Sequence, residues 1–239
     1  MSADRELLIR CLDLTSLGDN DDAATIDAVC ARAATPVAGR DDLAVAAVCI
    51  WPRFVPQART GLAHTPVRIA CATGGFPVPD EPLPQRLDQI RAAVDAGAHE
   101  VDVVCNRWLL DEPAALTEEL EATRAAAGPA TWKAILETGA LTDVGIRMTA
   151  ASAIAAGADF LKTSTGKGPP GASTPAVAAL AGQIGMADRP VGLKISGGIR
   201  EADQADAFLA LAREHLGHEW PGPATFRIGA SALLDALIA

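Results

Sequence analysis

Short apolar runs alternate along this chain with alanine-rich amphipathic segments, such as 84–96 and 142–156, and this rhythm restricts the folds open to it. Such alternation is typical of parallel strands joined by crossover helices. Eight strands with eight crossovers favour a single-domain α/β fold, a closed (β/α)8 TIM barrel with an additional N-terminal helix. Without the first strand, a doubly wound open sheet would fit better. The predicted strands are 11–15, 43–51, 67–73, 100–105, 132–138, 159–164, 191–196 and 226–229.

Length and composition limit what such a barrel can do. The 239 residues contain no linker rich in Ser, Gly or charge, so residues 1–239 are expected to form one domain. No segment approaches the roughly 18 apolar residues of a membrane span, and the charged first residues do not resemble a targeting signal, which predicts a cytoplasmic protein. The five cysteines form no C-x-x-C pair and are expected to be reduced. The net charge of -10 argues against binding to nucleic acid or anionic membranes, so the expected partners are small molecules.

Lysine is rare in this chain. Arginine stays charged in proteins, whereas a lysine can lose its proton and become an amine nucleophile. Each lysine lies in or just beyond a short apolar run, and a parallel barrel places its active site at the carboxyl ends of such strands. They are therefore candidates for chemistry, with compositional bias as the alternative. Only four of the twenty basic residues are lysines: Lys133, Lys162, Lys167 and Lys194.

Lys162 and Lys194 are predicted on consecutive strands, and neighbouring strands lie about 4.8 Å apart. Two unit charges roughly 5 Å apart at an effective dielectric of about 20 repel by about 3 kcal/mol, which depresses the pKa of one amine. A partly neutral lysine attacks carbonyls to give a Schiff base, an electron sink for carbon–carbon bond cleavage. Asp102 is placed to move protons, and a purely structural ion pair is its alternative role.

Two further side chains are predicted to support this site. Lys133 is expected to pair with a barrel carboxylate such as Asp102. Strand alternation puts Lys133 and Glu137 on one face, and Glu100 and Asp102 on one face. Cys49 lies near a strand end and could face the pocket, although a packed thiol is the commoner situation.

Three small-residue turns predict a phosphate site. Glycines let backbone N–H groups approach an anion, and helices expected to start near 198 and 230 would aim their positive ends at it. The segment T-S-T-G-K-G lacks the earlier Gly and the following Ser/Thr of a P-loop, which argues against a nucleoside triphosphate. The four histidines have no partners of metal-binding geometry, so no metal is expected. The turns are Gly166-Lys167-Gly168, Gly197-Gly198 and Gly229-Ala230-Ser231.

These motifs together resemble one enzyme family, the deoxyribose-phosphate aldolases, which are class I aldolases on a (β/α)8 barrel. The resemblance implies that Lys162 forms the Schiff base, Lys194 lowers its pKa and Asp102 relays protons. It also implies a homodimer that needs no cofactor and reversibly cleaves 2-deoxy-D-ribose 5-phosphate to acetaldehyde and D-glyceraldehyde 3-phosphate. The implied phosphate ligands are Gly166, Lys167, Gly197, Gly198, Gly229 and Ser231, with Thr15 and Thr163 near the sugar hydroxyls. The matching stretches are 12–15, 48–55, 100–104, 136–139, 157–167, 192–200 and 226–231.

Three departures from the family pattern leave alternatives open. The chain reads G-F-P-V-P at 75–79 where many members carry N-F-P-H-G, and Ala232 stands where some have a second Ser. It contains no Tyr, whereas some relatives end in a Tyr that assists proton transfer, so slower enamine protonation is expected. The alternatives are a related Schiff-base aldolase that prefers unphosphorylated or shorter aldehydes, and a non-catalytic barrel that binds sugar phosphates.

Overall fold

A computed structural model describes all of residues 1–239 and contains a closed barrel of eight parallel strands in sequence order. The predicted (β/α)8 fold is confirmed. The first strand, on which the choice between barrel and open sheet depended, is present: Asp13 pairs with Ala47 on one side and with Gly229 on the other. The strands are β1 (Leu12–Thr15), β2 (Ala47–Ile50), β3 (Arg68–Thr73), β4 (Glu100–Val104), β5 (Thr131–Ile135), β6 (Phe160–Lys162), β7 (Gly192–Ser196) and β8 (Phe226–Ala230).

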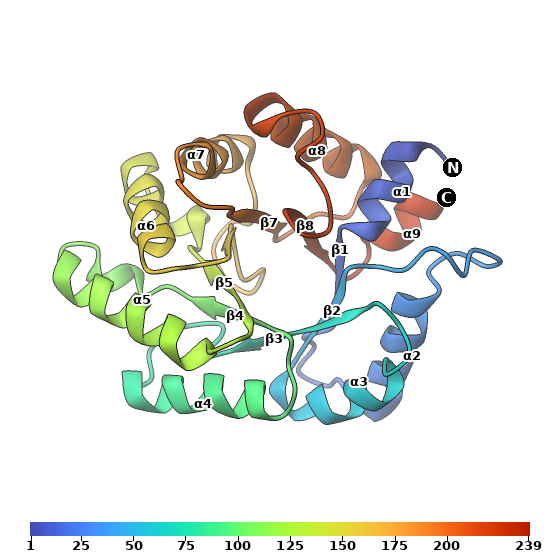
Figure 1. Cartoon of the computed structure of the whole chain (residues 1–239), viewed down its shortest axis with the longest axis horizontal. Helices are drawn as coiled ribbons and strands as arrows, with labels where there is room; N and C mark the ends of the chain where they lie inside the picture. Colours follow the sequence, from blue (N-terminus) through green and yellow to red (C-terminus); the bar gives the residue numbers. More distant parts are fainter.

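Helices form a ring outside the strands, and the additional N-terminal helix α1 lies beside α9 near the two chain ends (Figure 1). The segments expected to be helical at 84–96 and 142–156 are α4 and α6. Two residues after the end of each helix lies a glycine with left-handed backbone, Gly97 (φ 104°) or Gly157 (φ 95°), which reverses the chain toward the next strand. The helices are α1 (Ala3–Arg10), α2 (Ala23–Ala34), α3 (Val55–Gly61), α4 (Leu83–Asp95), α5 (Pro113–Ala127), α6 (Asp143–Ala155), α7 (Thr174–Gly185), α8 (Ala202–Leu216) and α9 (Leu233–Ile238).

Two different kinds of packing lie on the two sides of the barrel wall. Outward-facing side chains such as Leu12, Val101 and Leu193 pack against the helices in one large apolar core. The interior contains only a small apolar cluster, which consists largely of alanine and cysteine from β2 and β3, including Cys49. Because these side chains are short, they leave room for long charged side chains from the opposite strands. The barrel interior is therefore filled mainly by ionic groups.

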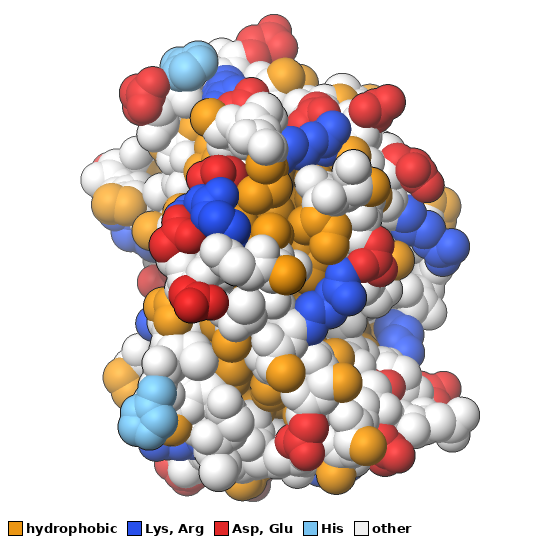
Figure 2. All heavy atoms as spheres, turned by 90° about the vertical axis from the view of Figure 1, so that its right-hand side faces the viewer, with side chains coloured by type: hydrophobic (Ala, Val, Ile, Leu, Met, Phe, Trp, Pro, Cys, Tyr) orange, Lys and Arg blue, Asp and Glu red, His pale blue; other side chains and the backbone are white.

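The surface carries side chains of both charges. Figure 2 shows the face that carries both chain ends, where acidic and basic side chains are interspersed around a band of hydrophobic ones. Arg213 with Asp4 and Arg40 with Glu6 are ion pairs on the surface of this part of the molecule. None of the helices is both long and apolar enough to cross a membrane.

Candidate active site

A cavity of about 450 Å³ opens at the carboxyl ends of the strands. The end of each contributing strand brings a polar group or a glycine to it, as parallel-barrel geometry requires. Eight of the residues predicted from sequence line this cavity. They are Thr15, Lys162, Gly166, Lys167, Gly197, Gly198, Gly229 and Ser231.

Asp102 lies directly beneath the cavity and joins three lysines. Its Oδ2 is 2.7 Å from the Nζ of Lys162 and 2.7 Å from the Nζ of Lys194. Its Oδ1 is 2.9 Å from the Nζ of Lys133. The register of the sheet produces this arrangement, because Lys162 pairs with Lys194 across β6 and β7, and Asp102 pairs with Lys133 across β4 and β5. All four side chains are buried.

The three lysines differ in how many carboxylates they contact. Lys133 contacts three, since Glu100 and Asp13 join Asp102, and Lys194 contacts Asp13 at 2.5 Å besides Asp102. Lys162 contacts Asp102 alone. Lys162 is also the only one of the three that lines the cavity. The amine that a substrate can reach is thus the one with the least carboxylate support.

The pKa values follow these contacts. Burial lowers the pKa of Lys162 below its ordinary value; Asp102 opposes this, and the positive charge of Lys194 adds to it. Burial also acts to lower the pKa of Lys194, but Asp102 and Asp13 raise it well above the usual lysine range. Although burial acts to raise the pKa of Asp102, Lys133, Lys162 and Lys194 hold it well below its usual range. Lys162 is therefore the group that loses its proton most easily.

Counting the buried charges leads to the same conclusion. Three carboxylates face the interior, and Lys133, Lys194 and Arg227 already balance them. The remaining buried cation, Lys162, is in excess when it is protonated. A buried charge without a full partner is costly, so neutrality of the barrel interior favours the free amine at this position.

Asp13, Glu100 and Arg227 complete this cluster, and the sequence reasoning gave them no role in the site. Arg227 donates to Asp13 at 2.6 Å and to Glu100 at 3.1 Å. Asp13 lies in a four-residue strand between Leu12 and Leu14, which point into the outer core. An acidic residue at an inward-facing position of a short apolar strand is the signal that could have identified it.

Thr163 differs from the expected role near sugar hydroxyls. Its side chain is fully buried, its Oγ1 donates to the carbonyl of Ser196 at 3.0 Å, and it accepts from the N–H of Ser196 at 3.0 Å. The hydroxyl therefore links the ends of β6 and β7 and does not line the cavity. Cys49 does not line it either: its thiol is buried and contacts Asp102 Oδ2 at 3.8 Å, and burial raises its pKa.

The side of the cavity formed by the glycine turns differs from the prediction at the helix ends. The sequence predicts helices that start near 198 and 230, but α8 begins at Ala202 and α9 at Leu233. Gly197 and Gly198 adopt left-handed backbone (φ 97° and 82°), so the turn after β7 continues for several residues before the helix starts. Two cations line this side, Lys167 and Arg200, and Arg200 was missed by the sequence reasoning.

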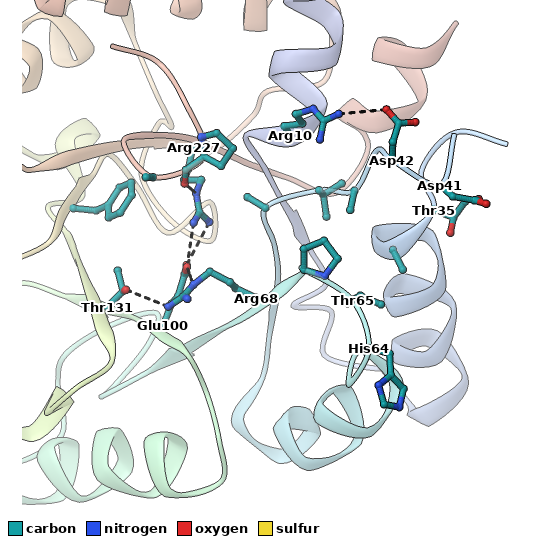
Figure 3. A pocket seen from close by; sticks show the side chains of 18 residues that line it. Arg10, Thr35, Asp41, Asp42, His64, Thr65, Arg68, Glu100, Thr131 and Arg227 are labelled. Atoms are coloured by element: carbon teal, nitrogen blue, oxygen red, sulfur yellow. Dashed lines mark hydrogen bonds and ion pairs between the residues drawn. The ribbon is translucent and has the colours of Figure 1, made fainter. Parts of the chain in front are cut away.

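A larger cavity, of about 700 Å³, lies at the opposite end of the barrel. Arg68, Glu100 and Thr131 are the first residues of their strands, so this cavity opens at the amino ends. Figure 3 shows Arg68 and Arg227 converging on Glu100 there. It contains no lysine, and each of these groups is already paired. We therefore take the smaller cavity, which Lys162 lines, as the candidate active site.

No group of three or more His, Cys, Asp or Glu side chains has the arrangement of a metal site.

Comparisons with known proteins identify an aldolase family and several aldolase relatives. A model of the DeoC/LacD family of aldolases matches residues 7–237. The deoxyribose-phosphate aldolase of Bos taurus is 38% identical over 246 residues, which cover 95% of this chain and 77% of that protein. A solved structure from Coccidioides immitis, provisionally assigned as a deoxyribose-phosphate aldolase, has a TM-score of 0.83 at 29% identity and covers 97% of this chain and 85% of its own. The deoxyribose phosphate aldolase of Aeropyrum pernix, described as a unique tetramer, has a TM-score of 0.79 at 26% identity and covers 98% and 90%.

Proposed function

The chain belongs to the DeoC/LacD family of aldolases, and on that basis we propose that it reversibly cleaves 2-deoxy-D-ribose 5-phosphate to acetaldehyde and D-glyceraldehyde 3-phosphate. One observation carries the proposal: the buried lysine with the least carboxylate support, Lys162, is the one that lines the cavity. Its neighbours Lys194 and Asp102 supply the charge and the proton acceptor that amine catalysis needs.

The first half of the reaction forms an imine. The neutral amine of Lys162 attacks C1 of the open-chain aldehyde and gives a carbinolamine, which loses water to become a protonated imine. Asp102 Oδ2, at 2.7 Å from this nitrogen, is positioned to accept and return the protons of these steps, directly or through a water. The same carboxylate stabilises the positive charge that the iminium places in the barrel interior.

The second half breaks the carbon–carbon bond. Asp102, directly or through a water, accepts the C3 hydroxyl proton; D-glyceraldehyde 3-phosphate leaves as the C2–C3 electron pair moves into the iminium, and an enamine remains on Lys162. Protonation of the enamine carbon gives the imine of acetaldehyde, and one water hydrolyses it to free the product and the amine. Lys194 stays charged throughout, because Asp13 and Asp102 both hold it.

The substrate phosphate is assigned to the opposite side of the cavity. Lys167 and Arg200 supply positive charge there, and the turns at Gly166, Gly197–Gly198 and Gly229 leave backbone N–H groups accessible, with the hydroxyl of Ser231 nearby. Thr15 donates to the carbonyl of Asp13 at 2.9 Å, and its oxygen can still accept from a sugar hydroxyl. No cofactor takes part in these steps.

Borohydride trapping tests the proposal. Reduction in the presence of acetaldehyde should add one ethyl group to Lys162, and the adduct should be absent in Lys162→Ala. Turnover of deoxyribose and of its 5-phosphate should then be compared, because an aldolase for unphosphorylated or shorter aldehydes would not favour the phosphorylated sugar. A chain that binds the sugar phosphate but forms no adduct would be a binding protein, and the proposal would fail.

We further propose that the chain acts as a homodimer in the cytoplasm. All five cysteines are buried free thiols, which suits a reducing compartment. Light scattering after size-exclusion chromatography should give a mass twice the 24.6 kDa of one chain. A tetramer, as described for the Aeropyrum pernix relative, would correct the assembly without affecting the proposed reaction.

A further inference from the structure

Glu137 is a buried carboxylate that the proposed amine chemistry does not use. Only 2% of the residue is exposed, and its hydrogen bonds go to Thr165 and not to the buried lysines. Its backbone is left-handed (φ 57°, ψ 55°), the only such conformation in this chain outside glycine. A bulky residue keeps this conformation only where its surroundings enforce it, and such positions cluster around functional sites.

The backbone around Glu137 shows what enforces the conformation. The N–H of Leu136 donates to the carbonyl of Lys162 at 2.9 Å, and the N–H of Thr138 donates to the carbonyl of Thr163 at 2.8 Å. In a regular parallel ladder these acceptors would be two residues apart, but here they are consecutive. One extra residue is therefore accommodated at Glu137, as in a β-bulge, and bulges change the direction of a side chain.

The redirected carboxylate holds the loop that follows β6. Thr165 Oγ1 donates to Glu137 Oε2 at 2.6 Å, and the N–H of Thr165 lies 3.4 Å from both carboxylate oxygens. The same Oγ1 accepts from the N–H of Lys167 at 3.1 Å. A continuous chain of hydrogen bonds thus joins Glu137 to the Gly166–Lys167 turn that lines the cavity.

The rest of this loop is held by close backbone packing. A Cβ atom at Gly139 would lie 1.9 Å from the carbonyl oxygen of Pro170, and one at Gly171 would lie 2.1 Å from that of Gly197. The distal part of the loop is therefore fixed by backbone contacts on both sides. The first part of the loop, which carries Lys167, is held in place by the hydrogen bonds between Glu137 and Thr165.

We infer that Glu137 is a positioning residue for phosphate recognition. Through its hydrogen bonds to Thr165, Glu137 fixes the position of the Gly166–Lys167 turn, so that Lys167 can contact the substrate phosphate. This inference rests on the proposed function, because it assigns the phosphate to that turn. It separates two tasks within one site. The Glu137–Thr165 pair serves selection of the phosphorylated sugar, whereas Asp102 and the buried lysines serve the amine chemistry.

Three variants test this role without relying on a destabilised fold. Glu137→Gly removes the carboxylate, and glycine adopts the left-handed backbone more easily than glutamate does. Thr165→Val removes the hydroxyl in a side chain of the same shape, and Thr165→Ser is the matched control that keeps it. For each variant, kcat/KM is measured for deoxyribose 5-phosphate and for deoxyribose, along with borohydride trapping of acetaldehyde on Lys162.

We expect Glu137→Gly and Thr165→Val to lower the preference for the phosphorylated sugar about tenfold, since each breaks a charge-assisted hydrogen bond that orders the turn. The loss should appear in KM, while trapping of acetaldehyde stays within about twofold of wild type and Thr165→Ser retains the preference. An unchanged preference in both variants would overturn the inference. An equal loss on both sugars would do the same, because Glu137 would then act on the chemistry.

The outcome for the wild-type enzyme distinguishes this inference from the proposed function. A wild type that prefers the phosphorylated sugar, with variants that share its preference, overturns the role of Glu137 alone. A wild type that turns over both sugars equally, or neither, overturns the phosphate assignment on which the inference rests.

Discussion

Lys162 and Lys194 share a single oxygen atom: Oδ2 of Asp102 lies 2.7 Å from both ammonium nitrogens. Only Lys194 has a second carboxylate, Asp13 at 2.5 Å. This one extra contact divides the roles of two otherwise similar side chains on neighbouring strands. Lys194 keeps its proton, and its charge helps Lys162 to lose one.

Replacing Lys162 with Met should abolish turnover, with a loss of roughly a thousandfold or more, because no other cavity-lining amine lies beside Asp102. The fold should survive, since the substitution removes the excess cation of the interior and leaves three buried cations against three carboxylates. Circular dichroism and the free energy of unfolding in urea check the second statement. Residual turnover near wild type would show that another lysine is the nucleophile.

Lys194→Met should raise the pKa of Lys162, because the nearest positive charge is removed. The acid limb of the pH profile of kcat/KM should therefore move to higher pH. Lys194→Arg is the charge-matched control, and we expect it to lose most activity as well. The space beside Lys194 is small, since a Cβ at Gly229 would lie 3.0 Å from its Cε, and a guanidinium does not fit there. Near wild-type turnover of Lys194→Arg would show that charge alone is needed.

The pH dependence of the wild-type enzyme should report the amine of Lys162. Burial lowers its pKa below the ordinary value of 10.5, and only the neutral form attacks the substrate. The kcat/KM should fall as pH falls through the lowered pKa. Between that pKa and 10.5 the unfolded chain binds more protons than the folded one, so this group makes the free energy of unfolding rise with pH in that window. An acid limb that is unchanged in the Lys194→Met variant would contradict this assignment.

Asp13→Asn should destabilise the protein by about 3–5 kcal/mol, because Lys194 and Arg227 would lose a buried carboxylate that both contact. Loss of that carboxylate should also lower the pKa of Lys194 and with it the activity. Equilibrium unfolding in urea measures the first effect. Asp235→Asn is the control: its pair with Arg32 is exposed, so the change should stay within about 1 kcal/mol. If both substitutions changed the free energy of unfolding equally, the buried contacts of Asp13 would contribute no more to stability than an exposed ion pair.

Thr163→Val should cost about 1–2 kcal/mol of stability and leave the KM for the sugar phosphate unchanged. Its hydroxyl bonds to the backbone of Ser196 and does not reach the cavity. Thr163→Ser should restore most of the stability. A raised KM with normal stability would return Thr163 to the substrate site, as the sequence reasoning expected.

The sequence was most informative where a polar residue interrupts an apolar strand. Lys162, Lys194 and Asp102 stand out for that reason, and strand alternation places them on the inner face. The contacts of Lys194 could not be foreseen, because Asp13 lies 181 residues away and meets it only when the barrel closes.

Local backbone detail was the second limit on prediction. Strand alternation predicts that Glu137 shares a face with Lys133, but β5 ends at Ile135. Glu137 itself has left-handed backbone, which turns its side chain away from that face. A bulge forms where two neighbouring strands differ in length. The alternation of apolar and polar residues along one strand carries no information about its neighbour. The helix starts after Gly198 and Ala230 were misplaced for a similar reason, since each turn is longer than its glycines suggest.

The ionic filling of the barrel has a consequence for how ionic strength acts on the enzyme. Lys194 is fully buried, whereas Lys167 is partly exposed and forms an ion pair at 3.6 Å with the exposed side chain of Asp19. Dissolved ions screen exposed charges over about 8–10 Å at physiological concentrations but screen buried pairs far less. Added potassium chloride should therefore raise the KM for the phosphorylated sugar and leave trapping of acetaldehyde on Lys162 almost unchanged. Ionic strength would then control how tightly the cavity holds the substrate phosphate, without changing how readily Lys162 reacts with the aldehyde.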